Sequence, residues 1–146
     1  DNHPERKLDY NNMVICCPGH IGDEDHCDRL KGSNDISFSP LDSAFISTLS
    51  YKTDGEIVSS EQKYNKEINE VLNLNTPLLK QNRKESWESV KRELIAIKKG
   101  NAWNKAVIEK YIKKYRSMHI KDGKSQYIPY CGIVIYNLQK KYRQIQ

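Results

Sequence analysis

The sequence predicts a mainly helical α+β fold, in which a β-hairpin is followed by a C-terminal helical lobe. Up to residue 60 the chain is rich in turn residues, and the pair Asp54-Gly55 separates two short runs of alternating apolar residues, which is a strong hairpin signal. After residue 60 apolar residues recur at helical spacing in four stretches. We therefore predict a module with a hairpin at residues 1–60 and a basic helical lobe at residues 61–146.

Charge differs sharply between these two parts. The net charge is +5, but residues 1–60 carry 5 Lys and Arg against 11 Asp and Glu, whereas residues 61–146 carry 19 against 8. An acidic part that holds cations, joined to a basic part that holds phosphates, is typical of a nuclease. Solvated Lys-rich helices explain the same charges equally well.

The four cysteines do not indicate a disulfide framework. Cys16 and Cys17 are adjacent, so a bridge between them needs strained geometry, and Cys131 lies in an apolar run far downstream. We therefore expect reduced cysteines and a cytoplasmic protein. No apolar run reaches about 18 residues, so no membrane partner is expected.

The stretch from Leu8 to Gly32 is expected to bring a strand, a turn and a helix start to one point. The apolar run 13–15 predicts a short buried strand that ends at Cys16-Cys17. Pro18-Gly19 then turns the chain. Asp28 to Lys31 is expected to open a helix, with Asp28 in its first turn.

Downstream we expect the hairpin and then four helices. The hairpin runs flank the turn at 44–51 and 56–59, because both residues of Asp54-Gly55 tolerate positive φ. The helices are predicted at 61–74, at 78–99 with Gly100 as the stop, at 102–118 and at 130–144, and 119–125 is predicted to be a loop. The residues expected to face inward are Tyr64, Ile68, Val71, Leu72, Leu79, Trp87, Val90, Leu94, Ile97, Trp103, Val107, Ile108, Tyr111 and Tyr115.

Several short motifs occur in a fixed order between Leu8 and about Arg83. They are LDYNN, a Cys, HCD followed by Lys-Gly, FSPLD, the YKTDGEI hairpin, and INEVLNLN with a following Arg. In this order they resemble the HNH (ββα-metal) nucleases, and more narrowly the PtuB-like HNH proteins of the Septu antiphage system, which also occur beside some retron reverse transcriptases. The resemblance implies a ββα-metal knuckle within residues 1–60. The Cys-x-x-Cys pair and the Glu/Asp-His motif that usually precede the Asn strand are expected upstream of Asp1.

The resemblance implies a structural zinc ion, because so small a ββα unit buries too little apolar surface to hold itself. Cys17 and Cys27 would form the second thiolate pair of the site, and the segment upstream would supply their partners. Cys16 lies on the opposite strand face from Cys17, so we expect it in the core. The alternative is that Cys17 and Cys27 are buried free thiols without a metal.

The resemblance also implies a catalytic divalent cation, Mg²⁺ or another, on a phosphate oxygen and the leaving group, with an upstream His as general base. Asn12, or alternatively Asn11, would orient the catalytic loop through its backbone. Asp28 falls at the third motif position, where a carboxylate is a good ligand for Mg²⁺, although it would also suit a helix cap. His26 would be a ligand or an orienting group.

Two other clusters are weaker candidates. His3 is the one early His, and we expect it in a variable loop rather than in the catalytic position. Asp23, Glu24 and Asp25 would form either a second cation cluster or a solvated acidic loop, and His20 is expected at the surface.

We therefore expect a metal-dependent HNH endonuclease that cleaves nucleic acid as the effector of an antiviral defence system. Its expected partners are a PtuA-like ATPase subunit and, further, a retron reverse transcriptase with its RNA or DNA. The alternative is a non-catalytic zinc-knuckle and helical module that binds nucleic acid or docks to a partner protein. The residues upstream of Asp1 distinguish the two, because a Cys-x-x-Cys pair with a Glu-His motif favours the enzyme.

Overall fold

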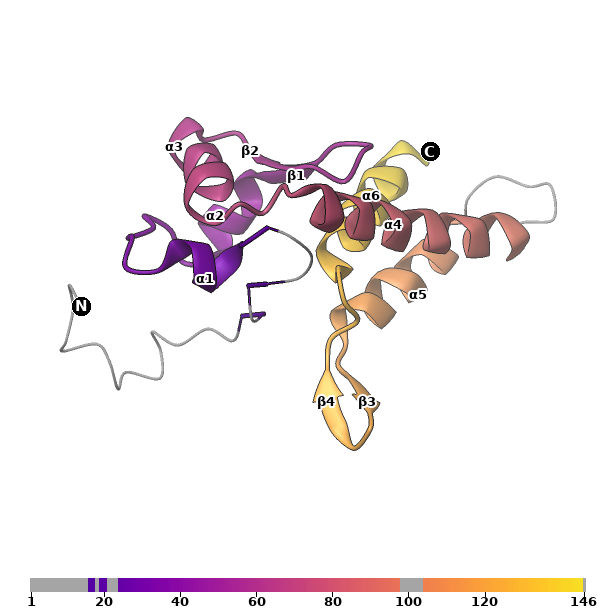
Figure 1. The fold of residues 1–146 in the computed structure, drawn as a ribbon. Coiled ribbons are helices and arrows are strands. Elements are labelled where there is room, and N and C mark those ends of the chain that lie inside the picture. The colour runs from indigo at the N-terminus through magenta and orange to yellow at the C-terminus, as the bar shows by residue number, and fades with distance from the viewer. Residues whose placement is uncertain (1–15, 18, 21–23, 98–103, 146) are drawn as a thin grey trace. The chain divides into compact units, whose positions relative to one another are not determined.

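A computed structural model describes residues 16–17, 19–20, 24–97 and 104–145 (Figure 1). The fold is α+β and mainly helical, as predicted, with two small two-stranded sheets. It divides into two compact units, unit 1 (Asp1–Ser50 and Ile57–Leu79) and unit 2 (Tyr51–Glu56 and Lys80–Gln146). The division therefore falls after Leu79, and the first residues of the predicted helical lobe belong to unit 1. None of the described helices is long and apolar enough to cross a membrane.

Unit 1 holds short elements that follow one another closely. They are α1 (Cys27–Lys31), α2 (Ser43–Thr48), most of the hairpin strands β1 (Leu49–Tyr51) and β2 (Ile57–Ser59), α3 (Gln62–Lys66), the π-helical turn η3 (Glu67–Val71) and the first residues of α4 (Pro77–Ile97). The helix expected at 28–31 is therefore present as α1, and it ends at Gly32, whose φ is +49°.

The prediction of a strand over 44–51 is wrong for most of its length, because α2 occupies Ser43–Thr48. Asp42 caps this helix by accepting a hydrogen bond from the Ala44 N–H at 2.8 Å. The helix places Phe45 in the core of unit 1, stacked on Phe38 with ring centroids 3.8 Å apart. The helix cap at Asp42 and the contact of Phe45 with Phe38 thus favour a helix here, although the alternating apolar pattern predicted a strand.

The hairpin turn also differs from the prediction, since Gly55 has a φ of +89° but Asp54 does not adopt a positive φ. Gly55 N–H donates to Lys52 C=O at 3.1 Å, and Lys52 N–H donates to Glu56 C=O at 2.9 Å. This is a three-residue loop that ends in a left-handed glycine. Arg83 of α4, a buried residue, donates from Nε to Gly55 C=O at 2.6 Å, so the loop is fixed to α4 within unit 2.

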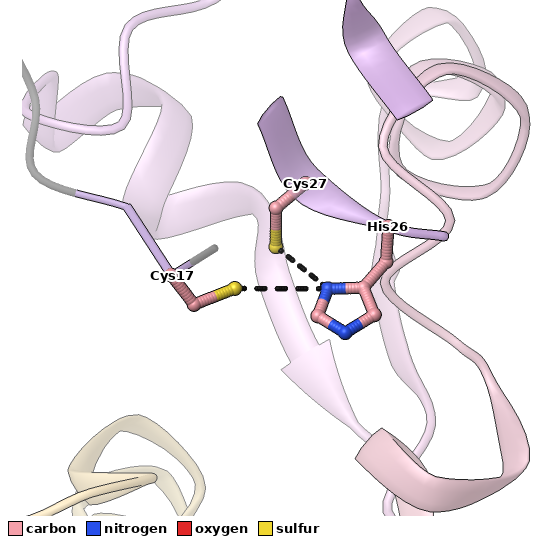
Figure 2. A group of neighbouring side chains, drawn as sticks. All are labelled: Cys17, His26 and Cys27. Carbon is pink, nitrogen blue, oxygen red and sulfur yellow. Dashed lines mark hydrogen bonds between the residues drawn. The ribbon is translucent and has the colours of Figure 1, made fainter. Parts of the chain in front are cut away.

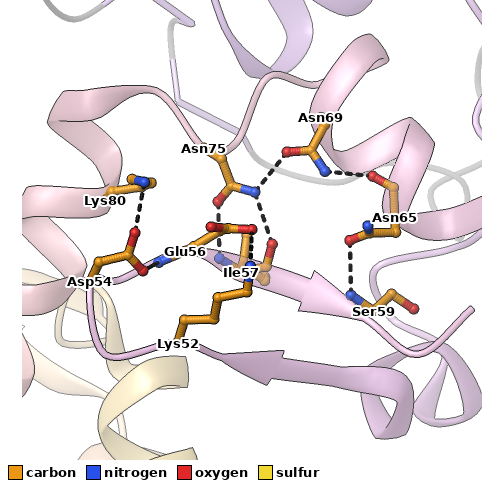
Figure 3. Close-up of polar contacts among 9 residues, drawn as sticks. All are labelled: Lys52, Asp54, Glu56, Ile57, Ser59, Asn65, Asn69, Asn75 and Lys80. Carbon is orange, nitrogen blue, oxygen red and sulfur yellow. Dashed lines mark hydrogen bonds and ion pairs between the residues drawn. The ribbon is translucent and has the colours of Figure 1, made fainter. Parts of the chain in front are cut away.

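Asparagine side chains form hydrogen bonds with the backbone groups on the outer edge of strand β2 (Figure 3). Asn75 accepts from the Ile57 N–H and donates to the Ile57 C=O, both at 2.9 Å, as a neighbouring strand would. Asn75 also donates to the side chain of Asn69 at 2.8 Å, and Ser59 N–H donates to Asn65 at 3.2 Å. The short hairpin therefore has a covered edge without a third strand.

The helix predicted over 61–74 is present, but its second half is a π turn. Leu72 N–H donates to Glu67 C=O at 2.9 Å, which is the i→i+5 pattern, and Ile68 in this turn is fully buried. Asn73, with a φ of +46°, ends the helix within the interruption expected before Pro77.

Unit 2 is a helical unit built from α4, α5 (Lys105–Arg116) and α6 (Cys131–Gln144). Of the predicted inward positions, Val90, Leu94, Ile108 and Tyr115 are buried in this unit, and Leu79 is buried in unit 1. Trp87, Val107 and Tyr111 are half-buried against the core, whereas Ile97 is 55% exposed and ends the described part of α4. Trp103 lies outside the described residues. The buried core of this unit consists of Val90, Leu94, Ile108, Tyr115, Ile133, Val134 and Leu138.

The prediction of a loop at 119–125 is wrong, because strands β3 (His119–Lys121) and β4 (Lys124–Gln126) form a second hairpin. Asp122 and Gly123 connect the strands, and both have positive φ, at 51° and 73°. This Asp-Gly pair therefore makes the tight turn that we expected of Asp54-Gly55.

Candidate metal centre

Cys17, His26 and Cys27 gather at the start of α1 with their ligand atoms all within 4.8 Å of one another. The Sγ of Cys17 lies 3.7 Å from Nδ1 of His26, and the Sγ of Cys27 lies 3.2 Å from the same nitrogen. Figure 2 shows the three side chains pointing toward one another, with both contacts ending on Nδ1. The structure thus brings together the two cysteines chosen from the sequence and adds His26 to them.

The spacing of these atoms fits a tetrahedral zinc ion. Zinc–sulfur bonds of about 2.3 Å and zinc–nitrogen bonds of about 2.05 Å at the tetrahedral angle place sulfur and nitrogen about 3.5 Å apart. The two observed sulfur–nitrogen distances, 3.7 and 3.2 Å, lie on either side of this value. Two thiols and an imidazole are also the soft ligands that zinc prefers over oxygen.

His26 is completely buried, which is unusual for a polar residue with few partners. Its Nδ1 contacts the two sulfurs, whereas its Nε2 points away from them (Figure 2) and has no hydrogen-bond partner among the described residues. Its backbone N–H donates to Gly19 C=O at 2.9 Å, which fixes the loop between them. The ring is therefore held inside by packing, with Nδ1 as its ligand atom.

Cys27 has a strained backbone and a thiol that resists ionisation. Its φ is +54°, in the left-handed region that a residue with a Cβ rarely adopts. Burial, together with the neighbouring thiol of Cys17, raises the pKa of Cys27 to about 12. A bound cation has the opposite effect and favours the thiolate, so metal binding at Cys27 would release a proton.

A close approach at Gly19 and ion pairs at the surface shape the loop before α1. Gly19 has a φ of +72°, and a Cβ added there would meet the His26 carbonyl and lie 2.7 Å from the Arg29 Cβ. His20 and Asp25 form an isolated β-bridge, and Asp25 also pairs with Arg29 at 2.9 Å. Because the His20 side chain bonds to it and Arg29 lies beside it, the pKa of Asp25 is lowered.

The two residues that follow η3 bond to the same loop. Cys27 N–H donates to Leu72 C=O at 2.8 Å, and the Asn73 side chain donates to Asp25 C=O at 3.1 Å. No role in this site was predicted for Leu72 or Asn73. The INEVLNLN motif was the available signal, but its contact with the loop before α1 depends on a turn that the sequence pattern does not show.

The other predicted site residues are placed as follows. Asp28 lies in the first turn of α1, is exposed and is outside the group of metal-binding atoms. Asn11, Asn12, His3 and the 13–15 strand lie outside the described residues. Cys16, expected in the core, is exposed, because the chain at 16–17 directs Cys17 and not Cys16 toward His26.

The acidic cluster at 23–25 does not gather at the site. Glu24 is exposed and Asp25 forms ion pairs with His20 and Arg29, while Asp23 lies outside the described residues. Among residues 16–17, 19–20, 24–97 and 104–145, the Cys17, His26 and Cys27 group is the one arrangement suited to a metal ion.

No protein family model matches the chain, no curated protein matches its sequence, and no solved structure matches its fold.

Proposed function

We propose that Cys17, His26 and Cys27 bind a structural zinc ion, with the fourth ligand supplied from outside the described residues. The observation that carries the proposal is their convergence on α1, a five-residue helix in which no residue is buried. An apolar core does not hold such a helix, and isolated helices of this length are unstable in water. A metal bound at its first residue would supply the missing free energy. Because the site needs reduced thiols, we also propose that the protein works in the cytoplasm.

Elemental analysis of purified protein tests the zinc site. Cys17→Ser, His26→Ala and Cys27→Ser are each expected to lose zinc. Cys131→Ser is the matched control, because Cys131 is also partly buried but lies at the start of α6 in unit 2. Full zinc occupancy in the Cys27→Ser variant would reject the site.

We further propose that the zinc knuckle belongs to an HNH endonuclease that acts with a PtuA-like ATPase subunit in antiviral defence, with a retron reverse transcriptase and its nucleic acid as a further partner. The resemblance to PtuB-like proteins supports this, as does the exposed position of Asp28 directly after Cys27. Asp28 would hold a catalytic divalent cation such as Mg²⁺, Asn12 would orient the loop, and a His preceding Asn12 would act as the general base.

The variant Asp28→Ala, in the full-length protein with its ATPase partner, tests the catalytic role. Loss of nucleic-acid cleavage with an unchanged melting temperature is expected of a metal ligand. If Asp28 only capped the helix, its removal would instead cost about 1 kcal/mol of stability and leave cleavage intact. Glu24→Ala is the control, because Glu24 is an exposed acid in the same unit.

The second candidate function is a non-catalytic zinc-knuckle module that binds nucleic acid or a partner protein. It is favoured by one observation, that the metal-binding group of the described residues contains thiols and an imidazole but no carboxylate. Nucleic-acid binding without cleavage by the full-length protein, in the presence of Mg²⁺ and the ATPase partner, would support this candidate against the enzyme.

A further inference from the structure

The β3–β4 hairpin extends away from the helices of unit 2 (Figure 1), and its residues beyond the half-buried His119 are exposed. Residues 120–127 are all exposed, including Ile120 at 81% and Tyr127 at 54%. The base of the hairpin is fixed, since His119 Nε2 donates to Lys114 C=O at 2.9 Å, in the last turn of α5. None of the residues 120–127 is buried, so this hairpin requires another explanation than packing.

The charges on this hairpin oppose its own stability. Lys121 pairs directly with Lys124, and His119 pairs with Gln126. Side chains two apart along a strand share a face, so these four residues form one polar face with two like charges opposite each other. Like charges directly opposite across a hairpin are destabilising unless an anion lies between or over them.

Further cations lie at the base of the hairpin. Lys113 and Arg116, in the last turn of α5, are exposed. Within the described part of the chain neither they nor Lys121 and Lys124 form an ion pair, whereas Lys52, Lys80 and Lys91 of the same unit each pair with an acid. The hairpin and the last turn of α5 therefore carry an excess of positive charge, in which Asp122 of the turn is the one acid.

We propose that the cationic ribbon, defined as β3, β4 and the last turn of α5, binds the phosphate backbone of duplex DNA. A two-stranded ribbon fits the major groove of B-form DNA, where lysines on its exposed face reach phosphates on the groove walls. The deep, narrow major groove of duplex RNA does not admit such an element. The proposal rests on the proposed function only in taking nucleic acid as the occupant, and it requires neither zinc nor cleavage.

The composition of the ribbon favours DNA over a membrane or an acidic protein. Membrane-binding elements present a continuous apolar face beside their cations. On the face opposite the lysines, exposed Ile120 is paired with the polar Ser125, and the exposed Met118 and Tyr127 lie beyond the strands at the base of the hairpin, so Ser125 interrupts the apolar row. An acidic protein partner would be bound through an apolar centre with charges at its rim, whereas the face of the hairpin that carries Lys121 and Lys124 holds no apolar residue. Phosphates spaced along a duplex match a row of lysines without an apolar centre.

The test compares two charge-matched double variants of the full-length protein. Lys121→Gln with Lys124→Gln changes the ribbon, and Lys63→Gln with Lys84→Gln removes two exposed lysines from α3 and α4. Affinity for a short mixed-sequence duplex DNA is measured across a range of salt concentrations. Duplex RNA of the same sequence, anionic phosphatidylserine vesicles and poly-glutamate are measured in parallel, and zinc content and cleavage are assayed on the same samples.

The ribbon variant is expected to bind duplex DNA more weakly at every sequence, with a slope of log affinity against log salt reduced by about 2. Its melting temperature should be unchanged or raised, because a like-charge pair is removed, and its zinc content should be unchanged. A salt slope equal to that of the control variant would overturn the proposal. So would tighter binding of duplex RNA, vesicles or poly-glutamate that depends on the same two lysines. Retained DNA binding with no cleavage would reject the nuclease and leave this proposal standing.

Discussion

The backbone N–H of Cys27 donates to the carbonyl of Leu72 at 2.8 Å, so the first residue of α1 is fixed to the end of η3. The two residues lie far apart in the sequence, and the bond is made at the one position of α1 with a left-handed backbone. The thiol of Cys27 is therefore aimed at Cys17 and His26 by a contact from a different element. The candidate metal centre depends on η3 as well as on its own loop.

Removal of zinc is expected to loosen both α1 and its contact with η3. After a strong zinc chelator is added to zinc-loaded protein, the amides of Cys27 and of the rest of α1 should exchange with solvent as fast as those of an unfolded segment, because five residues do not sustain a helix alone. Hydrogen exchange followed by NMR or mass spectrometry measures this. Amides of the unit 2 core, such as that of Leu138, serve as the internal control, and unchanged protection of α1 would contradict the prediction.

Gly19→Ala is expected to weaken metal binding, because its Cβ would collide with the His26 carbonyl and with Arg29. Gly32→Ala is the matched control, since Gly32 also has a positive φ but a Cβ there meets nothing within 4 Å. Both variants carry the conformational cost of an alanine at positive φ, about 1–2 kcal/mol in the left-handed region and more at Gly32, whose ψ is −122°. A zinc competition titration should show a loss of affinity for Gly19→Ala well beyond that of Gly32→Ala, and equal losses would refute the steric argument.

Asn75→Ala should destabilise unit 1 by about 1–3 kcal/mol, because it leaves both backbone groups of Ile57 without their partner. Asn34→Ala, at an exposed position in the connector after α1, should change stability by less than about 0.5 kcal/mol. Chemical denaturation gives the size of the effect, and the exchange rate of the Ile57 amide locates it. Normal protection of this amide in the Asn75→Ala variant would show that the asparagine does not replace a strand.

The pair of Lys80 and Asp54 predicts a small pH dependence in unit 2. Lys80 Nζ lies 2.7 Å from the Asp54 carboxylate, and this contact, with the Glu56 N–H, lowers the Asp54 pKa below its ordinary value of 3.8. A lowered carboxyl pKa contributes stability that is present above the ordinary value and lost as the pH falls through the folded value. An NMR titration should therefore find the Asp54 pKa higher in Lys80→Met than in the wild type. Lys91→Met, which removes a lysine elsewhere on α4, should leave the Asp54 pKa unchanged.

Helical periodicity was sufficient for the larger elements. The spacing of Val90, Leu94, Ile108 and Tyr115 predicted helices that pack, and these residues form the core of unit 2. The β3–β4 hairpin was missed because its strands are exposed on both faces, so no apolar alternation marks them. Its Asp122-Gly123 turn was the one local signal, and the same dipeptide at Asp54-Gly55 adopts a different turn.

The candidate site was predictable in its residue types but not in its geometry. The resemblance to HNH nucleases pointed to Cys17 and Cys27, and the position next to Cys27 made His26 a candidate. The contribution of His26 through Nδ1 depends on the turn at Gly19 and on the bond to Leu72, neither of which follows from sequence spacing. Long-range contacts of this kind are set by the packing of unit 1 as a whole.

The π turn η3 makes the length of this segment as important as its composition. An α-helix advances by about 100° per residue, and a π turn accommodates one residue more in a single turn. Deleting one residue within Glu67–Val71 would restore a regular α-helix and rotate everything after it, so the Leu72 carbonyl would no longer face Cys27. Deletions in η3 should therefore be tolerated far less than substitutions at its exposed position Glu70. Natural variation in this segment is expected to conserve its residue count more strictly than its side chains.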